Sequence, residues 1–138
     1  MRDQANELKL RPVIAPAVNT DLATPLVGAI IDRQGYESLT YAIATGALTD
    51  VDASYSVLLE ESDASDMSGA NAVADADLIG TEAAAGFDQD DDGSTRKIGY
   101  VGSKRYTRLT LWPTGADTGD SPVAAIAILG RPHEAPVV

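Results

Sequence analysis

Three segments of this chain alternate larger residues with small or polar ones at a period of two, and this alternation constrains the fold more than any other feature. The segments are 38–45, 53–61 and 106–112, with one interruption at Leu58. Residues two apart lie on the same face of a β-strand, so each segment predicts a strand. The first two have one face suited to burial, and both faces of 106–112 are candidates for burial because Tyr106 and Trp112 lie opposite its leucines. The predicted inward residues are Leu39, Tyr41, Ile43, Tyr55, Val57, Leu59, Thr107, Leu109 and Leu111.

Further strands are predicted over 29–32, 96–101 and 123–129, and 12–18 is predicted to be an edge strand because Pro12 and Pro16 cannot donate ladder hydrogen bonds. Turn residues separate these segments at short intervals, and no alternation of strands with helices appears. The pattern predicts an all-β, single-domain antiparallel β-sandwich, jelly-roll-like, with a long acidic loop over 61–87. That loop has room for a short helical turn over 71–78.

A chain of 138 residues has the size of one domain. Residues 1–11 are mostly polar and are predicted to be an N-terminal arm, followed by the β-sandwich domain over 12–131. Residues 132–138 contain two prolines without periodicity and are predicted to be a C-terminal tail. Such ends are commonly disordered in a monomer and ordered on a neighbouring subunit in an assembly.

Cysteine is missing and histidine occurs once, which removes many catalytic and metal sites. Carboxylates are plentiful, but in solvated loops they lack the apolar surroundings that raise a pKa for acid catalysis. There is no Cys, which excludes disulfides, thiolate zinc sites and a cysteine nucleophile. The single histidine, His133, excludes a multi-histidine metal site and lies in the predicted tail, where nothing would hold it against a serine. No phosphate-binding glycine pattern occurs. The sequence therefore predicts a protein that is not an enzyme and has no cofactor.

One acidic spacing resembles the opening of a calcium loop. Asp88, Asp90 and Asp92 precede Gly93 with the D-x-D-x-D-G spacing, but the position that should supply the bidentate Glu is Gly99. A full EF-hand loop is therefore excluded, and only a site with fewer oxygen ligands remains. The favoured interpretation is a solvated acidic turn.

The charge is divided unevenly along the chain. The formal net charge is −11, and residues 34–95 hold 14 of the 21 acids and none of the ten Lys and Arg residues. A basic segment follows, and its side chains are predicted to contact an acidic surface of a partner or of a neighbouring subunit: Arg96, Lys97, Lys104, Arg105 and Arg108. The overall acidity argues against nucleic acid as a partner. Solvated acidic loops on a β-domain are the equally weighted alternative.

The strand over 106–112 carries an aromatic and cationic face. Tyr106, Arg108 and Trp112 share it, which is compatible with a patch that binds sugar or nucleic acid. The favoured interpretation is that Trp112 is a core residue or an anchor in a subunit interface, where tryptophan is enriched.

No targeting or membrane segment is predicted. The N-terminus lacks the apolar stretch of a signal peptide, and the longest strongly apolar run, over 123–129, is far shorter than the roughly 20 residues of a spanning helix. The expectation is a soluble chain made in the cytosol, without a membrane partner.

Short motifs along most of the chain, from about residue 12 to 131, resemble small proteins encoded beside capsid genes in tailed phages and prophages. They include RQGYES at 33–38, TGALTD at 45–50 and LEESD at 59–63. Others are ADADLIG at 74–80, IGYVGSKRYTR at 98–108 and LGRP at 129–132.

The resemblance implies a virion structural protein of the capsid decoration or cement type. It implies the major capsid protein as partner, a location on the capsid surface after synthesis in the bacterial host cytoplasm, and no catalytic residues. A homotrimer is expected, because decoration proteins often cluster at local threefold axes. Two alternatives remain: a head–tail connector or tail protein, which would form rings, and a carbohydrate-binding module, which would expose Trp112 and Tyr106.

Overall fold

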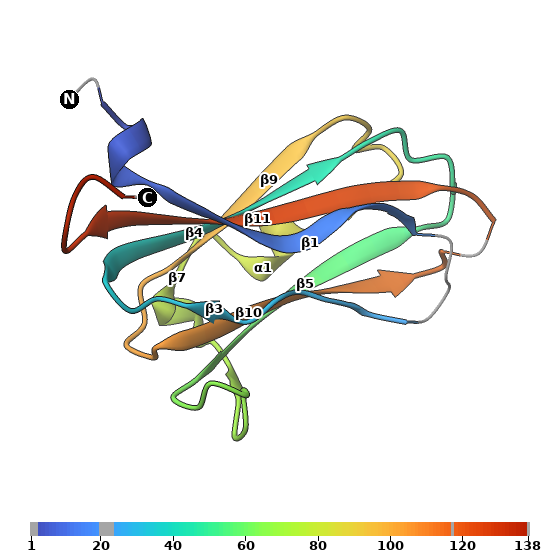
Figure 1. The fold of residues 1–138 in the computed structure, drawn as a ribbon. Helices are drawn as coiled ribbons and strands as arrows, with labels where there is room; N and C mark the ends of the chain where they lie inside the picture. Colours follow the sequence, from blue (N-terminus) through green and yellow to red (C-terminus); the bar gives the residue numbers. More distant parts are fainter. Residues whose placement is uncertain (1–2, 20–23, 117, 138) are drawn as a thin grey trace.

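The computed structural model describes residues 3–19, 24–116 and 118–137, which form two antiparallel sheets packed face to face (Figure 1). Sheet A has the strand order β1-β11-β4-β9-β7, and sheet B the order β2-β10-β5-β6, with β3 also paired to β10 and β8 to β5. This is the interleaved order of a jelly roll, so the predicted fold class is confirmed. The strands are β1 Lys9–Asn19, β2 Leu26–Val27, β3 Ile31–Asp32, β4 Tyr36–Thr45, β5 Ser54–Ser62, β6 Asn71–Ala72, β7 Leu78–Ile79, β8 Phe87–Asp88, β9 Thr95–Tyr100, β10 Tyr106–Thr114 and β11 Ser121–Pro132.

The core lies between the sheets and is built from the residues that the alternation assigns to it. All nine predicted inward residues are buried, and Leu59, Leu109 and Leu111 are completely inaccessible to solvent. Leu58, which interrupts the pattern, points to the outer face of β5, where it lies opposite Thr110 of β10 and is half-buried. Each long strand therefore has one face in the core and one outside.

The first strand lies at an edge, as the prolines predict. β1 pairs only with β11, and the register shifts between Pro12 and Ile14 and again between Ile14 and Ala17. Prolines and bulges of this kind protect an exposed edge from pairing with another chain. β1 begins at Lys9, three residues before the predicted boundary of the N-terminal arm, because Lys9 already pairs with Leu129.

The chain ends lie against the sandwich. The 3-10 helix η1 (Ala5–Glu7) precedes β1, and the backbone N–H of Val137 donates to the carbonyl oxygen of Asn6 at 2.8 Å. The N–H of His133 donates to the carbonyl oxygen of Gly35 at 2.9 Å. Both ends therefore lie at the same end of the molecule (Figure 1). The outermost parts of the predicted arm and tail, residues 1, 2 and 138, are outside the described residues.

The acidic segment 61–87 is not one long loop. It contains β6, the 3-10 helix η2 (Asp75–Asp77), β7 and the α-helix α1 (Glu82–Ala85). The short helical turn predicted within 71–78 is present as η2, and the two ends of this stretch pair with β5 and β9 as the short strands β6 and β7. The helix α1 begins after Thr81, whose Oγ1 accepts a hydrogen bond from the N–H of Ala84 at 3.0 Å.

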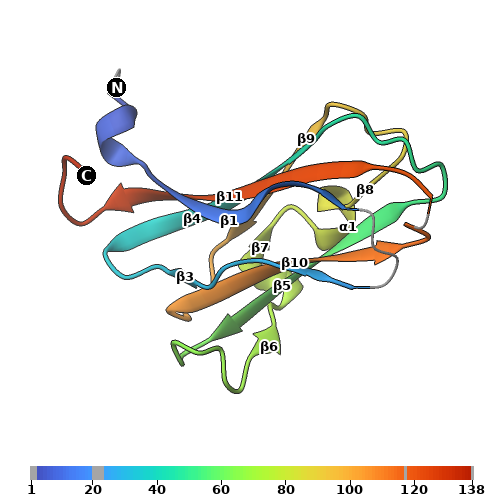
Figure 2. The ribbon, with the colours of Figure 1, turned by 45° about the vertical axis from the view of Figure 1, so that its right-hand side comes forward.

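The helix α1 lies between the sheets at the side opposite β1, where it contacts β5 and β9 (Figure 2). Its Glu82 accepts a hydrogen bond from the N–H of Leu59 at 2.7 Å, on the side of β5 away from β10 and between the residues that pair with β6 and β8. None of the helices formed by the described residues is long and apolar enough to span a membrane.

Two buried tyrosines make the fold sensitive to alkaline pH. Burial raises the pKa of Tyr41, and burial together with its hydrogen bond to Glu61 raises the pKa of Tyr100. The folded state favours the neutral phenols, so the stabilisation is complete below the unfolded pKa of about 10 and is lost as the pH rises above it. We expect the free energy of unfolding, measured by urea denaturation, to fall above about pH 10. The double substitution Tyr41→Phe with Tyr100→Phe should flatten this fall, and an unchanged profile would contradict the assignment.

Candidate functional site

Arg96 and Lys97 of the basic segment lie in β9, Lys104 and Arg105 in the connection to β10, and Arg108 in β10. Four of these five predicted contact residues form ion pairs within the molecule. Arg96 pairs with Asp91, Lys104 with Asp63 at 2.5 Å, Arg105 with Asp32 at 2.8 Å and Arg108 with Glu60 at 2.8 Å. Arg105 contacts both carboxylate oxygens of Asp32, and this hydrogen bonding lowers the pKa of Asp32. Arg108 and Glu60 are directly opposite each other on β10 and β5.

This pairing changes the interpretation of the charge division. Three of the four carboxylates come from the acidic segment 34–95, so folding brings its charges against the basic segment. These four cations therefore lie beside acids of the same molecule, and their contact with a partner or another subunit stays a prediction. Lys97 is exposed on β9 and forms no ion pair with the residues that the structure describes.

The connection between β9 and β10 is held by an arginine that the sequence analysis did not single out. Arg33 donates to the carbonyl oxygens of Lys104 and Gly102 at 2.6 and 3.0 Å, and its guanidinium lies 4.6 Å from the centre of the Tyr100 ring. Tyr100 in turn donates to Glu61 and accepts from the N–H of Lys104. The backbone of the basic segment therefore helps to hold the connection between β9 and β10, in addition to its predicted role as a contact surface.

The outer face of sheet B carries the exposed tryptophan. We call this surface the sheet B face and define it by Val27, Ser54, Ser56, Leu58, Glu60, Tyr106, Arg108, Thr110 and Trp112. Trp112 is 45% exposed, so the prediction that it belongs to the core is wrong, and the prediction of an interface anchor stays open. Tyr106 lies at the other end of β10, with the Arg105 guanidinium 5.0 Å from its ring centre.

The acidic turn after β8 is organised by hydrogen bonds between its carboxylates and the backbone. Asp88 accepts from the N–H of Asp90 at 3.0 Å, and Asp92 accepts from the N–H of Leu48 at 2.6 Å. Asp91 accepts from the N–H of Asp88, which lowers the pKa of Asp91, with a further contribution from Arg96. No group of three acidic or histidine side chains among the described residues is arranged to hold a metal ion. Asp88, Asp90 and Asp92 therefore fit the solvated turn better than the calcium loop.

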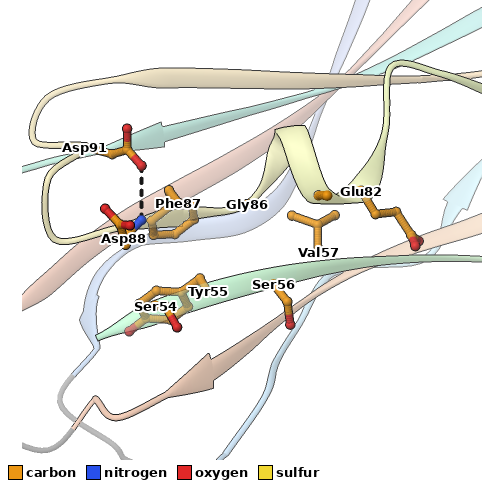
Figure 3. A pocket seen from close by; sticks show the side chains of 10 residues that line it. Ser54, Tyr55, Ser56, Val57, Glu82, Gly86, Phe87, Asp88 and Asp91 are labelled. Carbon is orange, nitrogen blue, oxygen red and sulfur yellow. Dashed lines mark hydrogen bonds between the residues drawn. The ribbon is translucent and has the colours of Figure 1, made fainter. Parts of the chain in front are cut away.

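A shallow pocket of about 470 Å³ lies beside this turn, between α1, β8 and the edge of β5 (Figure 3). The rings of Tyr55 and Phe87 are stacked at its wall, with centres 4.8 Å apart. Glu82 at the opposite end is engaged with the backbone of β5. His133 lies elsewhere, at the chain end, where it contacts the exposed Glu37 at 2.5 Å. These groups hold the fold together, and none of them forms a nucleophile–base pair.

The outer face of sheet A is a second flat surface, and the sequence analysis did not identify it. We call it the sheet A face, and it consists of Leu10, Pro12, Val18, Thr40, Ala42, Ala44, Ile79, Thr95, Lys97, Gly99, Pro122, Ala124, Ile126 and Ile128. Lys97 is the only charged residue in this set. The small residues at 42 and 44 belong to the outward half of the alternation over 38–45, but only the strand order brings them beside Ala124.

Comparisons with known proteins give no family. No protein-family model matches the chain, and no curated protein matches it. Among solved structures, a family two carbohydrate esterase from Cellvibrio japonicus has a TM-score of 0.44 at 10% identity, with 96% of this chain and 33% of the esterase chain covered. A xylan-binding module, CBM15, has a TM-score of 0.43 at 10% identity, with 96% and 95% covered.

A Clostridium thermocellum xylanase 10B with CBM22-1 and GH10 modules has a TM-score of 0.43 at 12% identity, with 88% of this chain and 24% of that chain covered. This chain therefore spans about a third of the esterase and a quarter of the xylanase chain. Likenesses at this level carry no functional argument. The geometry itself defines a jelly-roll sandwich with two flat outer faces, one aromatic with paired charges and one nearly free of charge.

Proposed function

We propose that this chain is a non-enzymatic structural protein of a tailed-phage virion, which binds the outside of the assembled capsid and stabilises it. The sequence motifs described above support the class, and the major capsid protein is the proposed partner. A protein that binds the assembled shell and not its separate subunits stabilises the shell by mass action. The proposal requires a rigid surface with a strong anchor and no reacting group.

The exposure of Trp112 is the observation that carries the proposal. This residue is 45% exposed on a flat sheet, and the neighbouring cation on its face, Arg108, is paired with Glu60. Tryptophan on a rigid surface buries a large area at little entropic cost, which makes it a frequent hot spot in interfaces. Paired charges also remove the need to desolvate an isolated charge on docking. We therefore place the capsid contact on the sheet B face.

Trp112→Ala is expected to weaken binding to capsids that lack the protein by at least tenfold. Binding is measured by co-sedimentation of the purified protein with assembled, expanded capsids over a range of concentrations. Ile79→Ala is the control, because Ile79 is also an exposed apolar residue, at 63%, and lies on β7 in the other sheet. Equal binding of the Trp112 variant and the wild type would refute this contact surface.

Charge reversal at Lys104 and Arg105 is a less direct test, because these residues pair with Asp63 and Asp32. Reversal would place two like charges together within the molecule as well as altering the surface. The variants Lys104→Gln and Arg105→Gln remove the cations without creating repulsion. Retained capsid binding in both would exclude these two side chains as contacts.

A carbohydrate-binding module is the second candidate, and the same exposed Trp112 favours it. Aromatic rings on a flat face can stack on sugar rings, and Tyr106 lies on the same strand. Soluble polysaccharides, including xylan, should then change the tryptophan fluorescence in a saturable way that Trp112→Phe alters. Capsid binding without such a change favours the virion role, and the reverse result favours the carbohydrate role.

A further inference from the structure

The sheet A face combines exposed apolar side chains with an almost complete lack of charge. Leu10, Val18, Ile79 and Ile126 on this face are 57%, 54%, 63% and 39% exposed. A further apolar hollow lies at one end, lined by residues that include Pro16, Pro122 and Ala124. Large contiguous apolar patches are rare on monomeric soluble proteins, and protein–protein interfaces are one of the features that they mark.

The charge of the rest of the chain decides which partner suits this face. With a net charge of −11, two copies repel each other through most surfaces, and a basic partner would be attracted to the acidic regions. The sheet A face attracts neither sign strongly, since Lys97 is its one charge. It is suited to an uncharged flat surface, and the same face of another copy meets that requirement.

We infer that the sheet A face is a self-association surface, on which two copies of this chain pack sheet against sheet. In such a twofold interface each copy presents the same residues to the other. Outward alanines at 42, 44 and 124 allow two sheets to approach closely, at the spacing of about 10 Å that is usual for stacked sheets. Lys97 lies on β9 opposite Ala42 of the central strand β4, and its long side chain can extend its amine past the apolar residues to solvent.

The area is sufficient for a specific but not a tight dimer. Four strands about 4.8 Å apart and roughly nine residues long cover roughly 600 Å² in each copy. Two copies would bury about 1,200 Å², at the lower limit for specific interfaces. We therefore expect a monomer–dimer equilibrium in the micromolar range, which sedimentation velocity can follow from low micromolar to several hundred micromolar protein.

The variants Ile126→Glu and Ile126→Lys test this surface with charges of both signs. Ile126 is 39% exposed at the middle of the face, so either charge stays near solvent in the monomer and is buried in the dimer. Both variants should weaken the dimer at least tenfold. Val27→Glu and Val27→Lys are the matched controls, because Val27 is 57% exposed on the sheet B face, and they should associate as the wild type does.

Salt gives an independent readout. Screening reduces the repulsion between two acidic copies and leaves apolar contact intact, so added NaCl should strengthen the dimer.

Ala44→Glu, at an exposed position of the same face, replaces Ile126→Glu if that variant does not fold. A wild type that stays monomeric would overturn the inference, as would Ile126 and Ala44 variants that associate normally or Val27 variants that dissociate.

This inference does not depend on the virion role. Self-association is measured on the free protein and uses the sheet A face, whereas the proposed capsid contact uses Trp112 on the sheet B face. A trimer that persists in the Ile126 variants would contradict the twofold interface and leave the virion proposal standing. Loss of capsid binding in the Trp112 variant with the dimer intact would leave both standing.

Discussion

Replacing Leu59 by alanine is expected to lower the free energy of unfolding by about 2–5 kcal/mol. Leu59 is completely buried and lies opposite the equally buried Leu109 in the centre of sheet B. Its backbone is held on the other side by Glu82 and by the N–H of Val73, so the strand cannot move to fill the cavity. The loss should therefore fall in the upper part of that range. Urea denaturation followed by circular dichroism measures it.

The neighbouring residue provides the control. Leu58→Ala removes the same atoms one position away, but Leu58 points to the outer face and is only half-buried. Its substitution should cost less than half as much, because less apolar surface leaves water on folding there. Equal losses at the two positions would mean that the inward and outward faces of β5 are assigned incorrectly.

Replacing Thr107 by valine is expected to cost about 1–3 kcal/mol, although the two side chains have nearly the same shape. The hydroxyl groups of Thr107 and Tyr41 are hydrogen-bonded at 2.6 Å, and both residues are completely buried, one in each sheet. Valine leaves the tyrosine hydroxyl without its partner in a place that water does not reach. Chemical denaturation of the single variants gives the cost of each unpaired group.

The double variant separates this bond from simple packing. In Tyr41→Phe with Thr107→Val both polar groups are absent, so neither is left buried and unpaired. Its loss should be smaller than the sum of the two single losses by about 1 kcal/mol or more. If the two losses are additive, the hydrogen bond between Tyr41 and Thr107 makes no contribution of its own to the free energy of unfolding.

The long strands could be predicted because their signal is local. Burial of one face leaves an alternation of several residues in the sequence, as in β4, β5 and β10, and the prolines of β1 mark its edge position. Strands β6, β7 and β8 have two residues each, which is too short for any period. Their positions depend on backbone pairing with β5 and β9, which the local sequence does not encode.

The candidate surfaces were harder to predict because they depend on contacts between distant residues. The separation of acidic and basic segments is real along the chain, but Arg108 meets Glu60 only through the register of β10 on β5. Trp112 could be placed on the outward side of its strand, whereas its exposure depends on what covers that side. The sheet A face could be identified only once the order of the five strands was known, because each strand contributes only a few of its exposed apolar residues.

The hydrogen bond between Asn6 and Val137 makes the described chain almost a closed ring. The strand pairs of the two sheets do not depend on which loop carries the chain ends, because each pair is held by its own backbone hydrogen bonds. A short linker across the two ends would allow the chain to be opened at the exposed turn around Gly69, between β5 and β6. A circular permutant of this kind keeps every strand pair of the jelly roll.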